Sequence, residues 1–186
     1  LEAAGASGVI LEDQQRPRRC GHLDGKQILP LEQFVDKLER VLATRREMLV
    51  VARTDASDPA DIRRRARAFD AAGADAILVD GQRDFELLRI IKSEVSRPLA
   101  FNMIAGGKSP RCSLPQLAAA GISIAIYSTP CLFAAQAAIA SAVDCLERTD
   151  GVLPEPAPGR TVGLGDCVDL LQENLAGRVL GGAGVP

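Results

Sequence analysis

The sequence predicts an α/β fold built on a parallel sheet, and three repeats of one local pattern are the main reason. In residues 1–12, 69–80 and 117–127, an Ala-rich helix end is followed by a glycine and a short apolar strand. A glycine just after a helix readily takes the left-handed conformation that ends it. Strands that are apolar on both faces are typical of a parallel sheet covered by helices. We therefore expect helix-to-strand joints at Gly5, Gly73 and Gly121.

Two more strands and five helices fit between these joints. The additional strands are expected at 48–53 and 98–102, and the helices at 31–46, 59–72, 84–95, 113–120 and 130–148. Asp58 followed by Pro59, and Ser113, are typical of helix N-termini. Five strands separated by helix-length segments predict a parallel sheet with helical connections.

The pattern changes after Asp150, where Pro154, Pro156 and Pro158 interrupt it. We expect a main region over residues 1–150 and a Pro/Gly-rich C-terminal extension over 151–186. The extension is predicted to hold a short amphipathic helix near 166–175 and a frayed Gly-rich end.

Composition narrows the classes of function. The chain has 186 residues, a formal net charge of −2 and no Trp, which argues against a nucleic-acid partner. Its five cysteines form no C-x-x-C pair, which indicates reduced cytosolic thiols. We expect no apolar run to reach the roughly 18 to 20 residues of a membrane span. The sequence therefore predicts a cytoplasmic protein with no membrane partner.

Every predicted strand ends in polar residues. They include Glu12 and Asp13, Arg53 to Asp55, Asp80, Asn102, and Tyr127 with Ser128. In α/β folds ligands bind at the carboxyl ends of the strands. Strand ends must also become polar where the chain reaches water, so no single position is decisive.

The loop after the first strand concentrates reactive side chains. Glu12 and Asp13 supply oxygen ligands of the type that Mg²⁺ prefers. Cys20 follows Arg18 and Arg19, and basic neighbours favour a thiolate that can act as an acid or base. Two residues later comes His22, the only histidine in the chain. Solvated acids and an incidental surface thiol are the simpler interpretation of each residue alone, and their combination favours a site.

These segments resemble the isocitrate lyase and phosphoenolpyruvate mutase superfamily, and above all its short-chain branch of methylisocitrate lyases, dimethylmalate lyases and carboxyphosphonoenolpyruvate mutases. The resemblance covers residues 1 to about 148. The matching stretches are EDQ at 12–14, PRRCGHL at 17–23, GK at 25–26, ARTDA at 52–56, AAGAD at 71–75, FNMIAGGKSP at 101–110 and IAIY at 124–127. Their order along the chain is specific, although no single stretch is.

The resemblance implies five C-terminal βα units of a (β/α)₈ TIM barrel, strands four to eight of the family, followed by a C-terminal helix. It implies a Mg²⁺-dependent lyase, with Mn²⁺ as a substitute, that acts on a small carboxylate through a pyruvate enolate. It also implies a homo-oligomer, a tetramer in this family, in which the last helix is usually exchanged between paired subunits.

Residue roles follow from the same resemblance. Glu12 and Asp13 would contribute to the metal site, Glu12 through water. Cys20 would deliver a proton to the enolate from a closing loop, in which Gly21 and His22 contact substrate. Arg53 would bind a substrate carboxylate, and Asn102 another part of the substrate. The catalytic residues are thus expected to be Cys20, His22 and Arg53.

Two departures from the family pattern leave alternatives open. Ala105 stands where most short-chain members carry Glu, and Asp80 where relatives often carry Glu. The sequence also contains no match to the family's first three strands, which predicts a truncated member. The alternatives are a non-catalytic remnant or partner-dependent half-barrel, a phosphonomutase or oxaloacetate decarboxylase of the same superfamily, and, less favoured, a complete five-stranded flavodoxin-like sheet.

Overall fold

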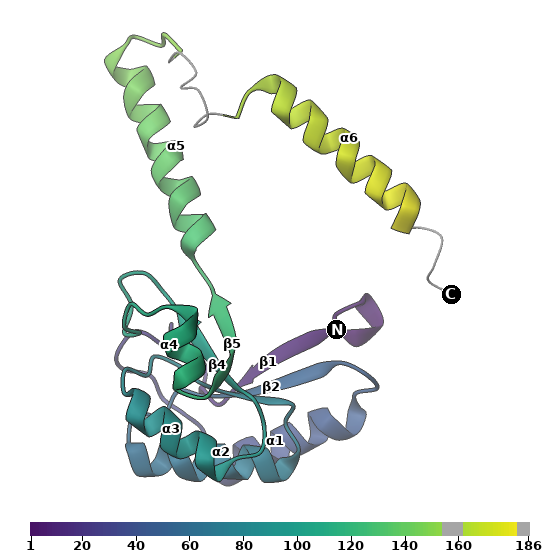
Figure 1. Cartoon of the computed structure of the whole chain (residues 1–186), viewed down its shortest axis with the longest axis vertical. Helices are drawn as coiled ribbons and strands as arrows, with labels where there is room; N and C mark the ends of the chain where they lie inside the picture. The colour runs from purple at the N-terminus through teal and green to yellow at the C-terminus, as the bar shows by residue number, and fades with distance from the viewer. Residues whose placement is uncertain (154–161, 182–186) are drawn as a thin grey trace. The chain divides into compact units, whose positions relative to one another are not determined.

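The structure, a computed structural model, describes residues 1–153 and 162–181 in two units (Figure 1). The first unit, Leu1–Leu132, holds a five-stranded sheet. Its elements are a 3₁₀ turn (Glu2–Ala4), β1 (Gly8–Glu12), α1 (Leu31–Thr44), β2 (Leu49–Thr54), α2 (Pro59–Ala72), β3 (Ala76–Val79), α3 (Phe85–Glu94), β4 (Leu99–Met103), α4 (Leu114–Ala119) and β5 (Ile122–Tyr127).

The sheet confirms the predicted α/β class. Its strands lie in chain order, β1-β2-β3-β4-β5, and every neighbouring pair is parallel. Helices α1, α2 and α3 lie along one side of the sheet (Figure 1). A parallel sheet that adds each new strand beside the last, with a helix between them, has the topology of part of a (β/α)₈ barrel. The flavodoxin-like alternative would need a strand order that reverses, so it is excluded.

The predicted joints and caps are present. Gly5, Gly73 and Gly121 have φ of 88°, 91° and 82°, a left-handed conformation that favours glycine. The side chain of Asp58 accepts the N–H of Asp61 at the start of α2, and Ser113 forms a capping box with Gln116 at the start of α4. Local chemistry therefore places the element boundaries within about two residues of the predicted ones.

The two faces of the sheet differ because successive strand residues point to opposite sides. Val50, Ala52 and Thr54 of β2 are fully buried, whereas Leu49, Val51 and Arg53 are not. The buried set faces the helices and joins a core that contains Phe34, Phe69 and Phe101, among others. The opposite face carries Arg53 at its carboxyl edge, and we call it the site face.

The second unit, Phe133–Pro186, contains most of α5 (Pro130–Arg148) and α6 (Leu164–Gly181). The unit boundary falls inside α5, whereas the sequence predicted a division after residue 150. Helix α6 includes the predicted helix near 166–175 and extends beyond it at both ends. The predicted Pro-rich break at Pro154, Pro156 and Pro158, and the glycine-rich end beyond residue 181, lie outside the described residues.

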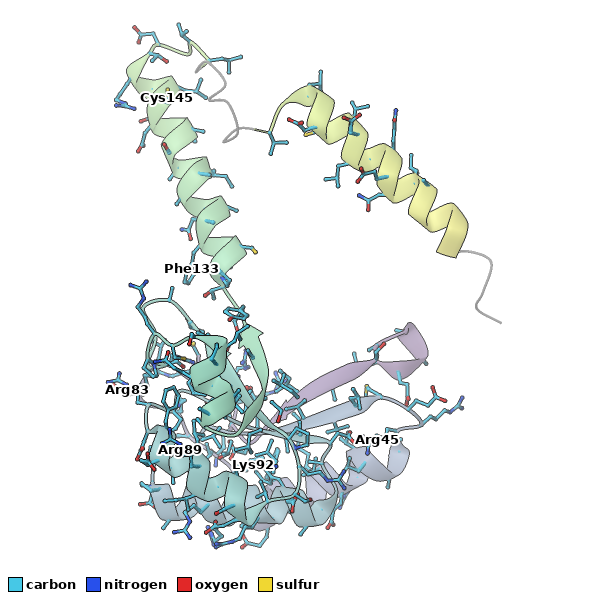
Figure 2. The ribbon with its side chains drawn as sticks, viewed as in Figure 1. Arg45, Arg83, Arg89, Lys92, Phe133 and Cys145 are labelled. Carbon is cyan, nitrogen blue, oxygen red and sulfur yellow. The ribbon has the colours of Figure 1, made fainter. Side chains whose placement is uncertain are left out.

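Helix α5 has no buried residue, and its side chains project along its whole length (Figure 2). Exposed apolar side chains include Leu132, Phe133, Ile139 and Val143. Its 19 residues have a mean hydropathy of 1.2 over the best window, so by length and composition it could cross a membrane. The expectation that no segment has this length and hydropathy was therefore wrong. One such helix is weak evidence for a membrane, because helices that pack in soluble proteins share these properties.

Candidate active site

Parallel pairing places the polar strand ends together on the site face. Glu12 of β1 pairs in register with Arg53 of β2. Asp80 directly follows β3, and its side chain reaches Arg53. Asn102 of β4 lies beside Asp80, and Ser128 follows β5. The carboxyl edge of the sheet therefore gathers the side chains that strand-end polarity predicted.

Arg53 is the centre of this group. Its Nε and Nη2 donate to the two carboxylate oxygens of Asp55 at 2.9 and 3.0 Å. Nη2 also lies 2.7 Å from Oδ2 of Asp80, and Nε lies 3.7 Å from Oε2 of Glu12. Three carboxylates therefore surround one guanidinium whose side chain is only 11% exposed.

The charges in this group determine its protonation. Burial alone would lower the pKa of Arg53, but its hydrogen bonds to Asp55 and the charge of Asp80 outweigh it, so the pKa is raised. Burial would raise the pKa of Asp55, but Arg53 outweighs it, so that pKa is lowered. Arg53 is therefore a fixed cation and Asp55 a fixed anion near neutral pH.

Asp80 and Asn102 connect the strand ends into one network. Nδ2 of Asn102 donates to Oδ1 of Asp80 at 3.0 Å, and the hydroxyl of Ser128 donates to Oδ1 of Asn102. Asp80 and Asn102 are both buried. Hydrogen bonds to both ends of its amide fix which way Asn102 points.

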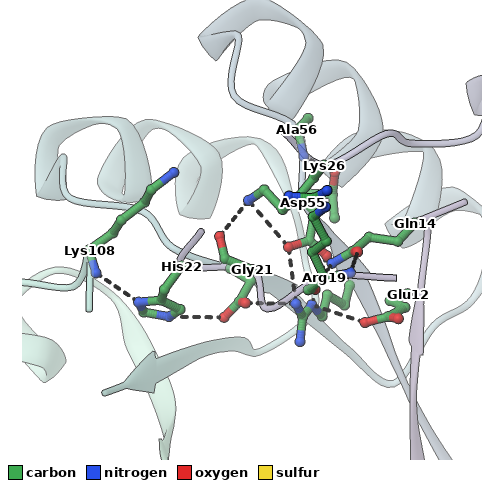
Figure 3. Close-up of polar contacts among 12 residues, drawn as sticks. Glu12, Gln14, Arg19, Gly21, His22, Lys26, Asp55, Ala56 and Lys108 are labelled. Carbon is green, nitrogen blue, oxygen red and sulfur yellow. Dashed lines mark hydrogen bonds and ion pairs between the residues drawn. The ribbon is translucent and has the colours of Figure 1, made fainter. Parts of the chain in front are cut away.

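The loop after β1 lies directly on this network (Figure 3). A methyl group at Gly21 would overlap Oδ2 of Asp80 and lie 2.6 Å from Nη2 of Arg53. Only a residue without a side chain can approach the ions so closely. Nζ of Lys26 donates to the carbonyl of Gly21 and lies 3.5 Å from Oδ1 of Asp55, which ties the loop to β2.

His22 is buried next to Gly21, and its ring lies between the backbone of Lys108 and the carboxylate of Asp80 (Figure 3). Its Nδ1 accepts the backbone N–H of Lys108 at 2.9 Å, and its Nε2 lies 3.5 Å from Oδ1 of Asp80. The structure thus brings Gly21, His22, Arg53 and Asn102 together, as their predicted substrate-binding role requires.

Cys20 precedes this docked segment in an exposed position. Its carbonyl accepts the N–H of Leu23 at 2.9 Å, which closes the turn that carries Gly21 and His22. Cys20 therefore sits at the rim of the site, and its role as a proton donor stays a prediction.

The two predicted metal ligands separate onto opposite faces of the sheet. Glu12 is on the site face and accepts two hydrogen bonds from Arg18, at 2.5 and 3.0 Å. Asp13 is completely buried on the helix side, where its oxygens accept from the hydroxyl of Thr54, the N–H of Asp55 and the guanidinium of Arg65. The structure does not bring Asp13 to the site, because adjacent residues of an extended chain point in opposite directions.

These donors do not fit a Mg²⁺ site on their own. Residues 1–153 and 162–181 contain no group of three or more His, Cys, Asp or Glu side chains arranged to hold a metal ion. Glu12 is engaged by Arg18, and Asp55 and Asp80 are engaged by Arg53. We therefore derive no chemical step through a metal from this chain.

A basic pocket opens beside Glu12 and Arg53. It has a volume of about 440 Å³, and the cations Arg16, Arg18 and Lys37 line it together with these two residues. An excess of positive side chains in a small pocket favours a small anion such as a carboxylate.

Four residues of the network had no assigned role in the sequence prediction: Lys26, Asp55, Asp80 and Lys108. Two of them, Asp55 and Asp80, could have been predicted as site residues, because polar residues just after parallel strands gather at the binding edge. Lys26 and Lys108 lie in loops, where only the folded chain shows which backbone groups and side chains they meet.

A parallel half-barrel whose polar side chains gather at the carboxyl ends of its strands is typical of the α/β class in which that edge holds the functional site. Comparison with known proteins makes this specific: residues 1–146 match the family model described as phosphoenolpyruvate phosphomutase. The chain belongs to this family, within the isocitrate lyase and phosphoenolpyruvate mutase superfamily.

Relatives include several lyases. A 2-methylisocitrate lyase of Aeropyrum pernix is 38% identical over 130 residues, which are 68% of this chain and 42% of the relative. A 2,3-dimethylmalate lyase of Eubacterium barkeri is 32% identical over 154 residues, 80% of this chain and 53% of the relative. The chain thus spans about half the length of these curated relatives.

Solved structures agree with this. Oxaloacetate acetylhydrolase bound to the inhibitor 3,3-difluorooxalacetate superposes with a TM-score of 0.83 and 30% identity, over 99% of this chain and 63% of that one. A 2,3-dimethylmalate lyase superposes with a TM-score of 0.81 and 26% identity, over 99% and 65%. The partial coverage of the solved chains fits a partial barrel.

Proposed function

We propose that the protein is a lyase that cleaves a carbon–carbon bond of a 2-hydroxy di- or tricarboxylate and releases pyruvate. The observation that carries the proposal is the docking of the Cys20–His22 loop on Arg53 and its acids. This arrangement combines a fixed cation for a substrate carboxylate with a loop that covers it. The similarity to 2-methylisocitrate and 2,3-dimethylmalate lyases supports this substrate class.

In this proposal Arg53 binds a carboxylate of the substrate. Its Nε and Nη2 are used by Asp55 and Asp80. Nη1 makes no hydrogen bond to any residue that the structure describes, so it can donate to substrate. Asn102, held by Asp80 and Ser128, can orient a second polar group. A cation held rigidly by its own acids needs little reorganisation when charge develops on the substrate.

In this cleavage the enolate forms on the fragment that is not pyruvate, which differs from the expected pyruvate enolate. When the substrate hydroxyl gives its proton to a general base of the complete enzyme, the C–O⁻ becomes the keto group of pyruvate and the adjacent C–C bond breaks. The electron pair of that bond moves to the other fragment, which becomes an enolate of its carboxylate. Cys20 would protonate this carbon rather than a pyruvate enolate. Closure of the loop would exclude water until this proton has been transferred.

We propose that the complete enzyme requires Mg²⁺ for activity and that Mn²⁺ can replace it. The full-length gene product is expected to release pyruvate from 2-methylisocitrate or 2,3-dimethylmalate only when Mg²⁺ is present. Pyruvate is measured by coupled oxidation of NADH with lactate dehydrogenase, and malate serves as the control substrate. Absence of Mg²⁺-dependent pyruvate with both substrates would overturn the proposal and favour a non-catalytic role.

A second candidate is hydrolysis of oxaloacetate, because the oxaloacetate acetylhydrolase structure shares both the fold and 30% identity. The two activities differ in their products, since hydrolysis of oxaloacetate releases oxalate and acetate. Oxalate from oxaloacetate, with no pyruvate from the hydroxy acids, would assign the hydrolase instead of the lyase.

We also propose that the protein is a cytoplasmic homo-oligomer, a tetramer in its complete form. The support is the exposed apolar side chains of α5, including Leu132, Phe133 and Ile139. Light scattering of the full-length gene product should give a mass about four times that of one chain, and fractionation should leave it outside the membranes. A monomer, or recovery with membranes, would contradict this proposal.

A further inference from the structure

The docked loop meets a second segment far away in the sequence, the turn that follows β4. This turn, residues 104–109, contains Gly106, Gly107 and Lys108. The N–H of Gly107 donates to the carbonyl of Ile104 at 3.0 Å, and the hydroxyl of Ser109 donates to the carbonyl of Asn102 at 2.6 Å. The turn is therefore closed on itself and tied to the end of β4 independently of the loop.

Gly107 provides the space in which the imidazole of His22 lies. A methyl group at this position would overlap Nδ1 of His22 and lie 3.1 Å from its Cγ. The φ of Gly107 is not positive, so the conflict would come from the ring and not from the backbone. The glycine is therefore required by the close approach of His22.

Lys108 holds the loop with two different groups. Its backbone N–H donates to Nδ1 of His22 at 2.9 Å, and its Nζ lies 2.6 Å from Oδ1 of Asp24. The side chain of Asp24 is 92% exposed, so this ion pair is screened by water and contributes little. The backbone bond to the buried ring is the stronger constraint.

That bond determines where the proton of the ring lies. A ring nitrogen that accepts an N–H carries no proton, so the neutral imidazole carries its proton on Nε2. Nε2 is buried and has no hydrogen-bond partner among the described residues. It faces the site, 3.5 Å from Oδ1 of Asp80. The ring thus directs this unpaired donor toward the carboxylate of Asp80, at the centre of the site.

We infer that Gly107 and Lys108 are positioning residues, which hold His22 as the Nε2–H tautomer directed into the site. Gly107 admits the ring and the N–H of Lys108 fixes its tautomer. The inference deepens the proposed function, since it rests on that function for the role of the Nε2 proton, but the position of the proton can be measured without any substrate.

Nuclear magnetic resonance of the ¹⁵N-labelled chain tests it, because His22 is the only histidine and its two ring nitrogens can be assigned without ambiguity. Long-range ¹H–¹⁵N correlation at neutral pH should show a bare Nδ1 and a protonated Nε2. Gly107→Ala should move both nitrogen shifts toward the average of a free imidazole. Gly165→Ala is the matched control, because nothing lies within 4 Å of a methyl group there, and it should keep the wild-type shifts.

Variants of Lys108 separate its two contacts. Lys108→Ala keeps the backbone N–H and should keep the tautomer, whereas Lys108→Pro removes the donor and should lose it. A proton on Nδ1 in the wild-type chain, or wild-type shifts in a folded Gly107→Ala, would overturn the inference. If Gly107→Ala does not fold, the tautomer of the wild-type chain and the comparison of Lys108→Ala with Lys108→Pro still test the inference. The expected tautomer without pyruvate release would refute only the proposed function.

Discussion

Replacing Arg53 with Met should reduce kcat/KM for pyruvate release about 100- to 1,000-fold and lower the free energy of unfolding by about 3–5 kcal/mol. The guanidinium lies between Asp55 and Asp80, whose side chains are 0% and 1% exposed. Without it, two buried carboxylates face each other, and Lys26, whose Nζ lies 3.5 Å from Oδ1 of Asp55, offsets only part of their charge. The substrate also loses the cation that binds its carboxylate. Urea denaturation and the coupled pyruvate assay measure the two effects separately.

The pH dependence of this loss has a definite sign. In the wild type the pKa of Asp55 is lowered, because Arg53 outweighs the burial that would raise it. Its contribution to stability is therefore present above the ordinary pKa and is lost as the pH falls through the folded value. In Arg53→Met burial outweighs the smaller lowering effects of Gln14 and Lys26, so that pKa should rise and the variant should gain stability as the pH falls. The stability difference between the two proteins should therefore shrink between about pH 7 and pH 4.

Arg40→Met is the matched control for Arg53→Met. Arg40 pairs with Asp36 on the surface of α1, and both side chains are more than half exposed. Its replacement should change stability by about 0.5 kcal/mol or less, at any pH in this range. Similar losses in both variants, or a stability difference that does not depend on pH, would show that Arg53 is not the counter-ion of a buried acid pair.

Replacing Asp13 with Ala should destabilise the fold by about 3–5 kcal/mol, although Asp13 is not on the site face. Its carboxylate links the end of β1 to Thr54 and to Arg65 of α2. Arg65 also donates to the carbonyl of Leu29 and to Asp61, so one buried network joins the loop, the strands and the helix. Removing the acid leaves a buried guanidinium and buried donors without their partner. Urea denaturation measures the loss.

The control is a double-mutant cycle with Arg65→Met. If the two residues stabilise the fold through each other, Asp13→Ala with Arg65→Met should cost clearly less than the sum of the two single changes. Additive costs would show that they act independently. The pH trend should be opposite to that of Arg53→Met. Burial raises the pKa of Asp13, so its contribution to stability declines as the pH rises through the raised value. The stability difference should therefore widen as the pH is lowered toward about 4.

Much of the fold could be predicted because its signals are local. Glycine at position 73 with φ of 91°, and the Asp58 and Ser113 caps, act within one or two turns of the chain. The strands could be predicted because each is a short, nearly continuous apolar run. Strand order also follows, since consecutive parallel strands joined by a helix normally lie side by side.

The site was predicted in part. Arg53, Asp80 and Asn102 lie at or just after the carboxyl ends of neighbouring parallel strands, so their meeting at one edge is a consequence of register. The roles of Glu12 and Asp13 were harder to predict from the sequence. Their adjacency suggested joint metal binding, but alternation along an extended chain puts one toward Arg18 and the other toward Arg65. Applying this alternation to Glu12 and Asp13 would have predicted that their side chains lie on opposite faces of the sheet.

By itself the sequence determined the family, the parallel α/β sheet and the edge at which its polar residues gather, because these depend on local patterns and on their order. Only the tertiary structure decided what the short loop of Cys20, Gly21 and His22 meets. Gly21 lies against ions from β2 and β3, and His22 binds a turn 86 residues away. Such contacts depend on close approach between distant segments, and no local preference of either segment encodes the distance between them.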